Sequence, residues 1–320
     1  MLNRCVNGFN SVNSRLADQF LSKNLAVSSR LDRRTFLAGL GGTAFAIPAF
    51  AKAATPRVAA LDWALLENLL VLNVVPVAAA ELTMFRQLAV EPVVPDTVAD
   101  LGLRRSINME LLYSLSPDLI YLSPFNSQSQ GLLSRIAPTR TFSLFESNVR
   151  PLPKMEAAIL AMGAELGRNE LAQDYVTRTQ SELAVLRHKL SAAASRPVFL
   201  VDMANARAVR AYREDSLFGN AMELLGFENA FGVDTAYPAF SPIGIEAMAE
   251  RPDAMIVVVG PVTPNIQQAL SQSVLWNALP AVKARRVFQL DAANAFGSLP
   301  AIRRFAGLFA NALLAENTLL

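Results

Sequence analysis

Cysteine and histidine are almost missing from this chain, which contains one of each, Cys5 and His188. A zinc site of the usual type needs several Cys or His ligands, and a Ser-His-Asp triad needs a histidine beside its nucleophile. His188 lies between Arg187 and Lys189 on the polar side of a predicted helix, so we expect it to be a solvated surface residue. The sequence therefore argues against zinc, thiol and triad chemistry.

Common nucleotide-binding motifs are also lacking. No GxGxxG follows a predicted strand, no GxxxxGK[ST] occurs, and no basic patch points to a nucleic acid partner. Asp62 and Asp202 lie near predicted strand ends and could serve acid–base catalysis, but the sequence does not place them together. We therefore predict no enzyme activity, no metal site and no intrinsic cofactor.

The N-terminal segment has the features of an export signal. Asp32–Leu37 (DRRTFL) places paired arginines before a Gly/Ala-rich apolar stretch, and Ala49 and Ala51 supply the small residues that a signal peptidase reads. A membrane anchor or a chance arginine pair are the alternatives. The stretch is short and glycine-rich for a bilayer span. The order of these features predicts a twin-arginine signal at residues 1–51, removed near Ala51, and a periplasmic protein.

Removal of this signal would change the net charge of the chain and remove its single cysteine. The whole chain carries a net charge of +2, whereas residues 52–320 contain 23 basic and 25 acidic residues, a net charge of −2. Cys5 would leave with the signal, so no lipid anchor on a cysteine is expected. We expect a free, soluble monomer.

Short β-rich runs alternate with helical patterns, which favours parallel α/β sheets. The predicted strands are 57–63, 74–79, 118–123, 140–145, 198–203, 254–259 and 286–291. The predicted helices are 64–72, 108–116, 131–136, 215–225, 266–275 and a C-terminal amphipathic helix with Ile302, Phe305, Phe309 and Leu313 on one face. We find no strand pattern between residues 154 and 194.

A long helix is predicted instead in that interval. Its apolar face is marked by residues at three- and four-residue steps: Ala172, Tyr175, Thr179, Leu183, Leu186 and Leu190. Gly167 and Asn169 are expected to separate it from a preceding helix. The predicted fold is α/β, with two Rossmann-like lobes (52–150 and 196–320) bridged by a helical connector (151–195) that includes this single long helix. A helix is a stiff connector, so small lobe motion is expected.

Five stretches then suggest a family, namely 60–78, 93–124, 134–142, 215–231 and 273–292. In this order they resemble the ferric hydroxamate siderophore-binding periplasmic proteins of iron ABC importers, solute-binding proteins with the helix-bridged class III fold. The resemblance implies a protein that captures a ferric siderophore, of hydroxamate type, in the cleft between its lobes. It also implies an inner-membrane ABC permease as the partner, and iron held by the siderophore alone.

The tripeptide Gly102-Leu103-Arg104 is the central match. The resemblance implies that Arg104 contacts the iron-bound hydroxamate oxygens, which suits a guanidinium with several fixed N–H donors. The alternative is a surface arginine at a loop-to-helix junction, which is the role we expect for Arg105.

The remaining cleft residues are expected to be aromatic or apolar, because the organic arms of a siderophore are bulky. The candidates are Trp63, Phe85, Phe125 and Asn126 in the first lobe, and Met203, Tyr212, Tyr237, Phe240 and Phe296 in the second. Each of them taken singly could equally be a core residue. Asn126 stands where the family has tyrosine, while Leu88 and Tyr237 stand at or near its tryptophans. These departures leave the particular siderophore open.

Glu110 and Glu246 each open a predicted helix, one in each lobe. The resemblance implies that they dock against permease arginines; the alternative is a favourable interaction with the helix dipole. Other ligands also stay open. Haem would need an axial ligand such as Tyr212 or Tyr237, a corrinoid is a further option, and a catecholate chelate would favour several arginines. Those arginines could be Arg207, Arg210 and Arg213. A twin-arginine-exported α/β enzyme is the remaining alternative.

Overall fold

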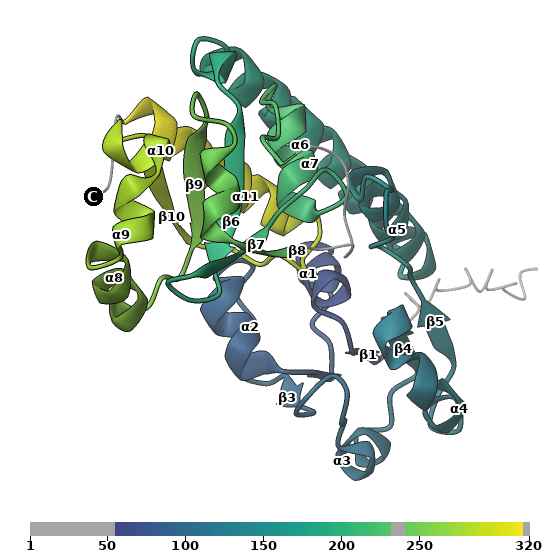
Figure 1. Cartoon of the computed structure of the whole chain (residues 1–320). Coiled ribbons are helices and arrows are strands. Elements are labelled where there is room, and N and C mark those ends of the chain that lie inside the picture. The colour runs from purple at the N-terminus through teal and green to yellow at the C-terminus, as the bar shows by residue number, and fades with distance from the viewer. Residues whose placement is uncertain (1–54, 232–240, 316–320) are drawn as a thin grey trace, which may run out of the picture. The chain divides into compact units, whose positions relative to one another are not determined.

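The computed structural model describes residues 55–231 and 241–315. The predicted export signal and the candidate residues Tyr237 and Phe240 lie outside these described ranges. Within them the chain forms two five-stranded sheets covered by helices (Figure 1). The predicted fold class, two α/β lobes with a helical bridge, is confirmed.

The N-terminal lobe is built on a parallel sheet of order β3-β2-β1-β4-β5. Its strands are β1 (Val58–Ala60), β2 (Ala78–Ala79), β3 (Ala99–Asp100), β4 (Leu119–Leu122) and β5 (Thr139–Thr141). Its helices are α1 (Trp63–Val71), α2 (Leu82–Leu88), α3 (Met109–Ser114), the 3-10 helix η1 (Pro124–Ser129) and α4 (Gln130–Leu133). In a parallel sheet the carboxyl ends of the strands share one edge, and the loops that follow them are brought together there.

The C-terminal lobe has a mixed sheet of order β10-β9-β6-β7-β8. Its strands are β6 (Val198–Met203), β7 (Ala208–Ala211), β8 (Ser241–Gly244), β9 (Met255–Gly260) and β10 (Val287–Ala292). Its helices are α7 (Leu217–Leu224), η3 (Ile245–Ala249), α8 (Pro264–Ser271), α9 (Val274–Ala278), α10 (Pro280–Lys283) and α11 (Leu299–Leu314). β10, β9 and β6 are parallel, whereas β7 pairs antiparallel with both β6 and β8.

The antiparallel strands β7 and β8 are not among the predicted elements. A short turn joins β6 to β7, in which the Asn205 side chain accepts hydrogen bonds from the backbone N–H groups of Arg207 and Ala208, at 2.8 and 3.0 Å. Such a short connection permits only antiparallel pairing, since a parallel pair needs a long crossover. The hairpin sets Asp202 of β6 directly opposite Arg210 of β7.

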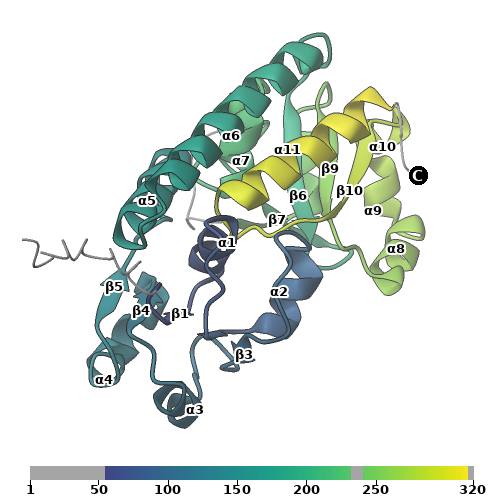
Figure 2. The ribbon, with the colours of Figure 1, turned by 180° about the vertical axis from the view of Figure 1, so that it is seen from behind.

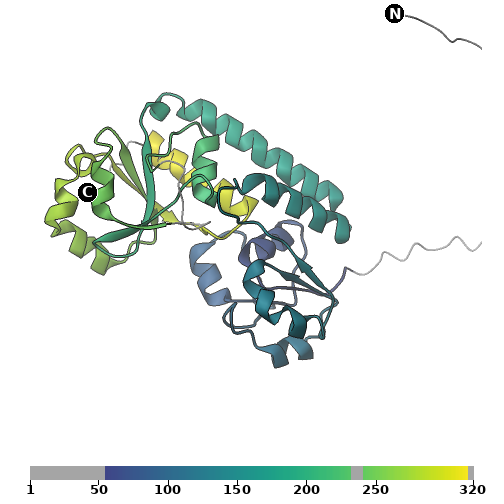
Figure 3. The same cartoon turned by 45° about the vertical axis from the view of Figure 1, so that its right-hand side comes forward.

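Two helices, α5 (Leu152–Glu165) and α6 (Asn169–Leu190), form most of the connector, and the short η2 (Ala193–Ser195) follows them. Gly167 has a φ of +65° between α5 and α6, a backbone conformation that favours glycine and ends the first helix. Figures 2 and 3 show α6 running alongside both α5 and α11. None of the helices in the described ranges combines the length and apolar character needed to cross a bilayer.

One hydrophobic core runs through both lobes and the connector. It includes residues of α1, α5, α6, α7 and α11. The rings of Phe218 on α7 and Phe305 on α11 stack with centroids 4.6 Å apart, and Phe309 lies 5.6 Å beyond Phe305. Because this core is continuous, the two lobes are held by packed side chains as well as by the connecting chain.

Candidate functional site

Arg104 lies in the loop that follows β3, and this loop is held tightly. Gly102 adopts a φ of +76°, which allows the chain to turn, and its N–H donates to Asp100 at 3.0 Å. The Nε of Arg104 donates to Glu81 Oε2 at 2.6 Å, and the Nδ2 of Asn126 donates to the Arg104 carbonyl at 3.1 Å. The Arg104 side chain is therefore oriented by one partner and its backbone by another.

Aromatic rings from both lobes lie against the Arg104 guanidinium. Its carbon lies 4.2 Å from the centroid of the Trp63 ring at the start of α1, and 5.7 Å from the Phe296 ring. Phe296 lies in the C-terminal lobe, in the segment between β10 and α11. The indole N–H of Trp63 donates to the Ala80 carbonyl at 3.2 Å, which fixes the ring. Both distances allow cation–π attraction between the guanidinium and the ring.

Two adjacent cavities meet at this arginine. The first, of about 280 Å³, is lined by residues of both lobes: Trp63, Met84, Leu88, Arg104, Asp202, Met203, Arg210, Tyr212, Val259, Gly260, Pro261, Ala293, Asn294, Ala295 and Phe296. The second, also about 280 Å³, is lined by Glu81, Leu103, Arg104, Arg105, Phe125 and Phe296. Arg104 and Phe296 line both cavities, so the two adjoin at these residues between the lobes.

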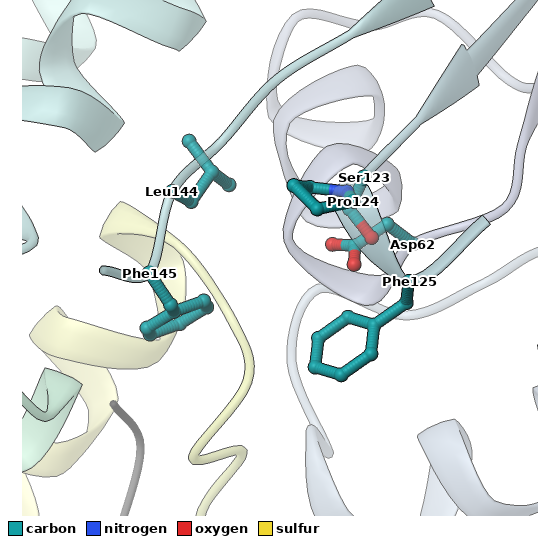
Figure 4. A pocket seen from close by; sticks show the side chains of 6 residues that line it. All are labelled: Asp62, Ser123, Pro124, Phe125, Leu144 and Phe145. Carbon is teal, nitrogen blue, oxygen red and sulfur yellow. The ribbon is translucent and has the colours of Figure 1, made fainter. Parts of the chain in front are cut away.

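A third cavity of about 290 Å³ adjoins the second through Phe125. Figure 4 shows Leu144 and Phe145 on one side of it, with Ser123, Pro124, Phe125 and Asp62 on the other. The walls are mainly apolar, and the Phe145 ring meets Phe296 edge-on with centroids 6.3 Å apart. This cavity suits an apolar arm of a ligand.

Asp62 supplies the polar floor of this third cavity. Its carboxylate caps α1 by accepting a hydrogen bond from the Ala64 N–H at 2.9 Å. Burial raises the pKa of the Asp62 carboxyl, while Ser123 and the nearby Arg104 charge act in the opposite direction. Asp62 and Asp202 line different cavities, so the structure does not bring them together as an acid–base pair.

The wall formed by the C-terminal lobe has its own polar network. Arg210 Nε donates to Asp202 Oδ1 at 2.6 Å, and the Tyr212 hydroxyl donates to Asp202 Oδ2 at 2.8 Å. Burial, and then the neighbouring Asp202 carboxylate, raise the pKa of Tyr212 well above its ordinary value. Tyr212 is therefore a neutral hydrogen-bond donor at this wall.

The other predicted site residues lie as follows. Phe85 is buried, and its ring packs edge-on against the Trp63 ring with centroids 5.9 Å apart. Asn126 is 2% exposed and links two loops. Its Nδ2 donates to the Arg104 carbonyl, and its Oδ1 accepts a hydrogen bond from the Ser123 N–H at 3.4 Å. Phe125 and Met203 line cavities, as described above. His188 is exposed near the end of α6, as expected.

Several lining residues are not among the predicted ligand-binding residues, notably Glu81, Asn294 and Phe145. Asp202 and Arg210 also line the first cavity, and the sequence named them only as an acid–base candidate and as a possible catecholate-binding arginine. Glu81 precedes α2, a helix that is not among the predicted elements. Phe145 ends a predicted strand, 140–145, whose observed counterpart β5 ends at Thr141. An aromatic residue just past a strand end is the signal that could have identified Phe145.

Glu110 and Glu246 are exposed in the first turns of α3 and η3. Each lies in a different lobe, as the sequence predicts, and their docking role stays a prediction. Among the described residues, no group of three or more His, Cys, Asp or Glu side chains is arranged to hold a metal ion.

A cleft between two helix-bridged α/β lobes, with a few oriented polar groups among aromatic walls, is typical of a protein that binds small solutes. A family model described as periplasmic binding protein matches residues 58–293, and the chain belongs to this family. The members of this family are periplasmic binding proteins. Together with the two FhuD proteins described next, this match confirms the predicted family resemblance.

A curated relative is the iron(3+)-hydroxamate-binding protein FhuD of Escherichia coli K12. It is 27% identical over 257 residues, which cover 80% of this chain and 86% of that protein. The crystal structure of the siderophore-binding protein FhuD from Vibrio cholerae, bound to Fe³⁺-Desferal, matches with a TM-score of 0.77 and 26% identity, covering 82% of this chain and 99% of that one.

The triscatecholate siderophore-binding protein FeuA of Bacillus subtilis shares the fold, with a TM-score of 0.67, 19% identity and coverage of 82% of this chain and 94% of that one. The family and the two FhuD proteins are described as binding proteins, which confirms the prediction of a binding protein rather than an enzyme.

Proposed function

We propose that this protein is the solute-binding component of an ABC importer, which captures a ferric siderophore of hydroxamate type between its lobes and delivers it to an inner-membrane permease. The observation that carries the proposal is the position of Arg104. Its guanidinium is oriented by Glu81, stacks on Trp63 and lines the two cavities that the lobes share.

The chemistry of the ligand fits this arrangement. A ferric hydroxamate presents oxygens with partial negative charge, and a guanidinium donates hydrogen bonds to such oxygens from a fixed plane. Trp63, Phe296 and Phe125 supply apolar walls for the organic arms. The iron arrives already chelated and is cargo, so the protein binds the chelate and contributes no metal ligand.

Other ligands fit the site less well. Haem ligation by tyrosine needs a phenolate, whereas Tyr212 has a raised pKa and donates to Asp202. His188 lies on the exposed face of α6, away from the cavities. A catecholate chelate is the runner-up because Arg210 lines the cavity opposite Arg104. No observation favours a corrinoid.

Export and docking belong to the same proposal. Twin-arginine export follows from the segment at 1–51, and a periplasmic location accords with the family to which the chain belongs. Glu110 and Glu246, exposed in the first turns of helices in the two lobes, would meet cationic side chains of the permease. The ligand would then be released between two anchored lobes.

Fluorescence quenching tests the proposal directly. The chain contains two tryptophans, and Trp63 lines the cavity. Ferric desferal should quench the emission in a saturable manner, while iron-free desferal, haem and a corrinoid should bind more weakly. Arg104→Ala should weaken binding about tenfold or more, because it removes charge-assisted hydrogen bonds. Arg135→Ala, at an exposed arginine of the same lobe, is the matched control. Absence of saturable quenching by any ferric chelate would overturn the proposal.

A further inference from the structure

We propose that Glu67 is a positioning residue of the ligand site. Through its buried carboxyl it holds the segment that joins β10 to α11 (residues 293–298, the β10–α11 segment) and so fixes the Phe296 ring at the site. This inference rests on the proposed function, for which that ring is a wall. Glu67 acts from outside the site, because it is fully buried and is not among the residues that line the described cavities.

The β10–α11 segment forms part of the ligand site. Residues 293–296 all line the first cavity, and Phe296 also lines the second. The Phe296 ring lies 5.7 Å from the Arg104 guanidinium carbon and meets the Phe145 ring edge-on, with centroids 6.3 Å apart. A displacement of this segment would therefore change the shape of the wall that the C-terminal lobe presents to a ligand.

Hydrogen bonds connect the Glu67 carboxyl with the backbone of Phe296. The Nδ2 of Asn294 donates to Glu67 Oε1 at 2.7 Å, and the Oδ1 of the same amide accepts from the Phe296 N–H at 3.0 Å. The Ser298 N–H donates to Glu67 Oε2, also at 2.7 Å. The carboxyl therefore holds the segment on both sides of Phe296.

The segment also packs directly against this carboxyl. A Cβ at Gly297 would lie 2.5 Å from Glu67 Oε2 and 2.6 Å from Oε1. Asn294 is 1% exposed and Ser298 is fully buried, so water does not reach these residues to replace the hydrogen bonds. A buried donor left without an acceptor is costly. The segment can therefore leave its position only by giving up buried hydrogen bonds to Glu67.

Trp63 and Glu67 lie one turn apart on α1, and residues at this spacing share one face of a helix. The Trp63 ring lies 4.2 Å from the Arg104 guanidinium carbon. Figure 2 shows α1 beside the start of α11, where the β10–α11 segment ends. One helix of the N-terminal lobe thus carries the Trp63 wall directly and the Phe296 wall through Glu67.

Ferric desferal titrations of wild type and Glu67→Gln test this proposal. The amide keeps the shape of the carboxyl, but its nitrogen cannot accept, so one of the bonds from Asn294 and Ser298 is lost. The affinity should fall about three- to tenfold, as expected for one lost buried hydrogen bond. Glu182→Gln is the matched control, because Glu182 also holds α11, through Arg303, and lies outside the described cavities. Its affinity should stay within about twofold of wild type.

A double-mutant cycle with Phe296→Ala separates positioning from general support of the fold. Phe296→Ala should itself weaken binding, because it removes the ring from the wall of the site. In that background Glu67→Gln should have little further effect on affinity, since the ring that it positions is already missing. The melting temperature should still fall as much as it does in the wild-type background. Additive losses of affinity would overturn the inference.

A third readout needs no ligand. The chain contains two tryptophans, so Trp276→Phe leaves Trp63 as the only one. Trp63 is 2% exposed and lines the first cavity together with Phe296. Acrylamide should therefore quench its emission weakly. Glu67→Gln in this background should increase the quenching, because a displaced Phe296 opens the cavity, whereas Glu182→Gln should leave it unchanged.

The outcomes distinguish this inference from the proposed function. If Glu67→Gln binds ferric desferal as wild type does, the inference is overturned and the proposed function stands. If the wild type binds no ferric chelate, the proposed function fails. Acrylamide then decides the inference: increased quenching supports the positioning of Phe296 by Glu67, and unchanged quenching overturns it.

A second variant covers the case in which Glu67→Gln does not fold. Gly297→Ala displaces the same segment, because its Cβ meets the Glu67 carboxyl. Weakened ferric desferal binding by this variant in its folded state supports the inference, and native affinity overturns it.

Discussion

One carboxyl oxygen of Glu67 accepts a hydrogen bond from the backbone N–H of Ser298 at 2.7 Å, and this contact joins α1 of the N-terminal lobe to the start of α11 in the C-terminal lobe. The other oxygen accepts from Asn294 Nδ2, also at 2.7 Å. Glu67 is fully buried, and Asn294 lines the cavity next to Phe296. The two lobes therefore share a buried polar contact close to the ligand site.

This contact should make stability depend on pH. Burial raises the pKa of Glu67 to about 8, although the hydrogen bonds from Ser298 and Asn294 act against the shift. Between its ordinary pKa in the unfolded chain and the raised value, the native state holds a proton that the unfolded state has lost. Stability should therefore fall as pH rises towards 8, by up to about 1.4 kcal/mol per pH unit.

Glu67→Gln should abolish this part of the pH dependence, since an amide does not titrate. Urea unfolding of wild type and variant between pH 5 and pH 8 measures the difference between the two slopes, and other titrating groups cancel in the comparison. Parallel stability curves for the two proteins would show that Glu67 keeps an ordinary pKa.

Gly297 is required by the same contact. A Cβ at this position would lie 2.5 Å from Glu67 Oε2 and would also collide with the Ala301 side chain. Gly297→Ala should therefore destabilise the protein by ~1–3 kcal/mol, as overpacking does. Gly307→Ala is the matched control, because Gly307 lies in α11 with open space around its Cβ position. Alanine there should stabilise the helix by ~0.5–1 kcal/mol. Thermal unfolding of both variants measures the contrast, and equal melting temperatures would contradict it.

Local patterns in the sequence were sufficient to predict much of this architecture. The buried strands β4, β6 and β9 are short, largely apolar runs, and α6 shows a regular apolar face. The predicted strand 74–79 is reduced to β2, and the predicted helix 266–275 is two helices, α8 and α9. Ser273 caps the second of these by accepting from the Trp276 N–H, which explains the break.

The site was predictable where a residue has a distinctive type, as with Arg104, Trp63 and Phe296. It was not predictable where a contact depends on how strands or lobes pair. β7 has the sequence AVRA, which lacks an apolar run, so neither the strand nor the Asp202–Arg210 pair could be foreseen. The contact of Glu67 with Ser298 joins residues 231 positions apart and arises only from lobe packing.

Glu81 should act on the ligand through Arg104. Glu81→Gln weakens the bond to the Arg104 Nε and frees the guanidinium plane, so ferric desferal affinity should fall several-fold. In the Arg104→Ala background the same change should have little further effect, because the group that it orients is already missing. Additive losses in this double-mutant cycle would indicate that Glu81 contacts the ligand independently.

Permease docking can be separated from the helix-dipole explanation of the same residues. Glu110→Ala and Glu246→Ala should leave ferric desferal affinity unchanged, because neither residue lines the described cavities. Each should lower siderophore-dependent iron uptake by cells, since an exposed charge at a protein interface chiefly affects association. Glu170→Ala is the matched control, because Glu170 is also an exposed acid in a first helical turn, that of α6. If all three variants lower uptake equally, the dipole interaction explains the effect; if only the first two do, docking explains it.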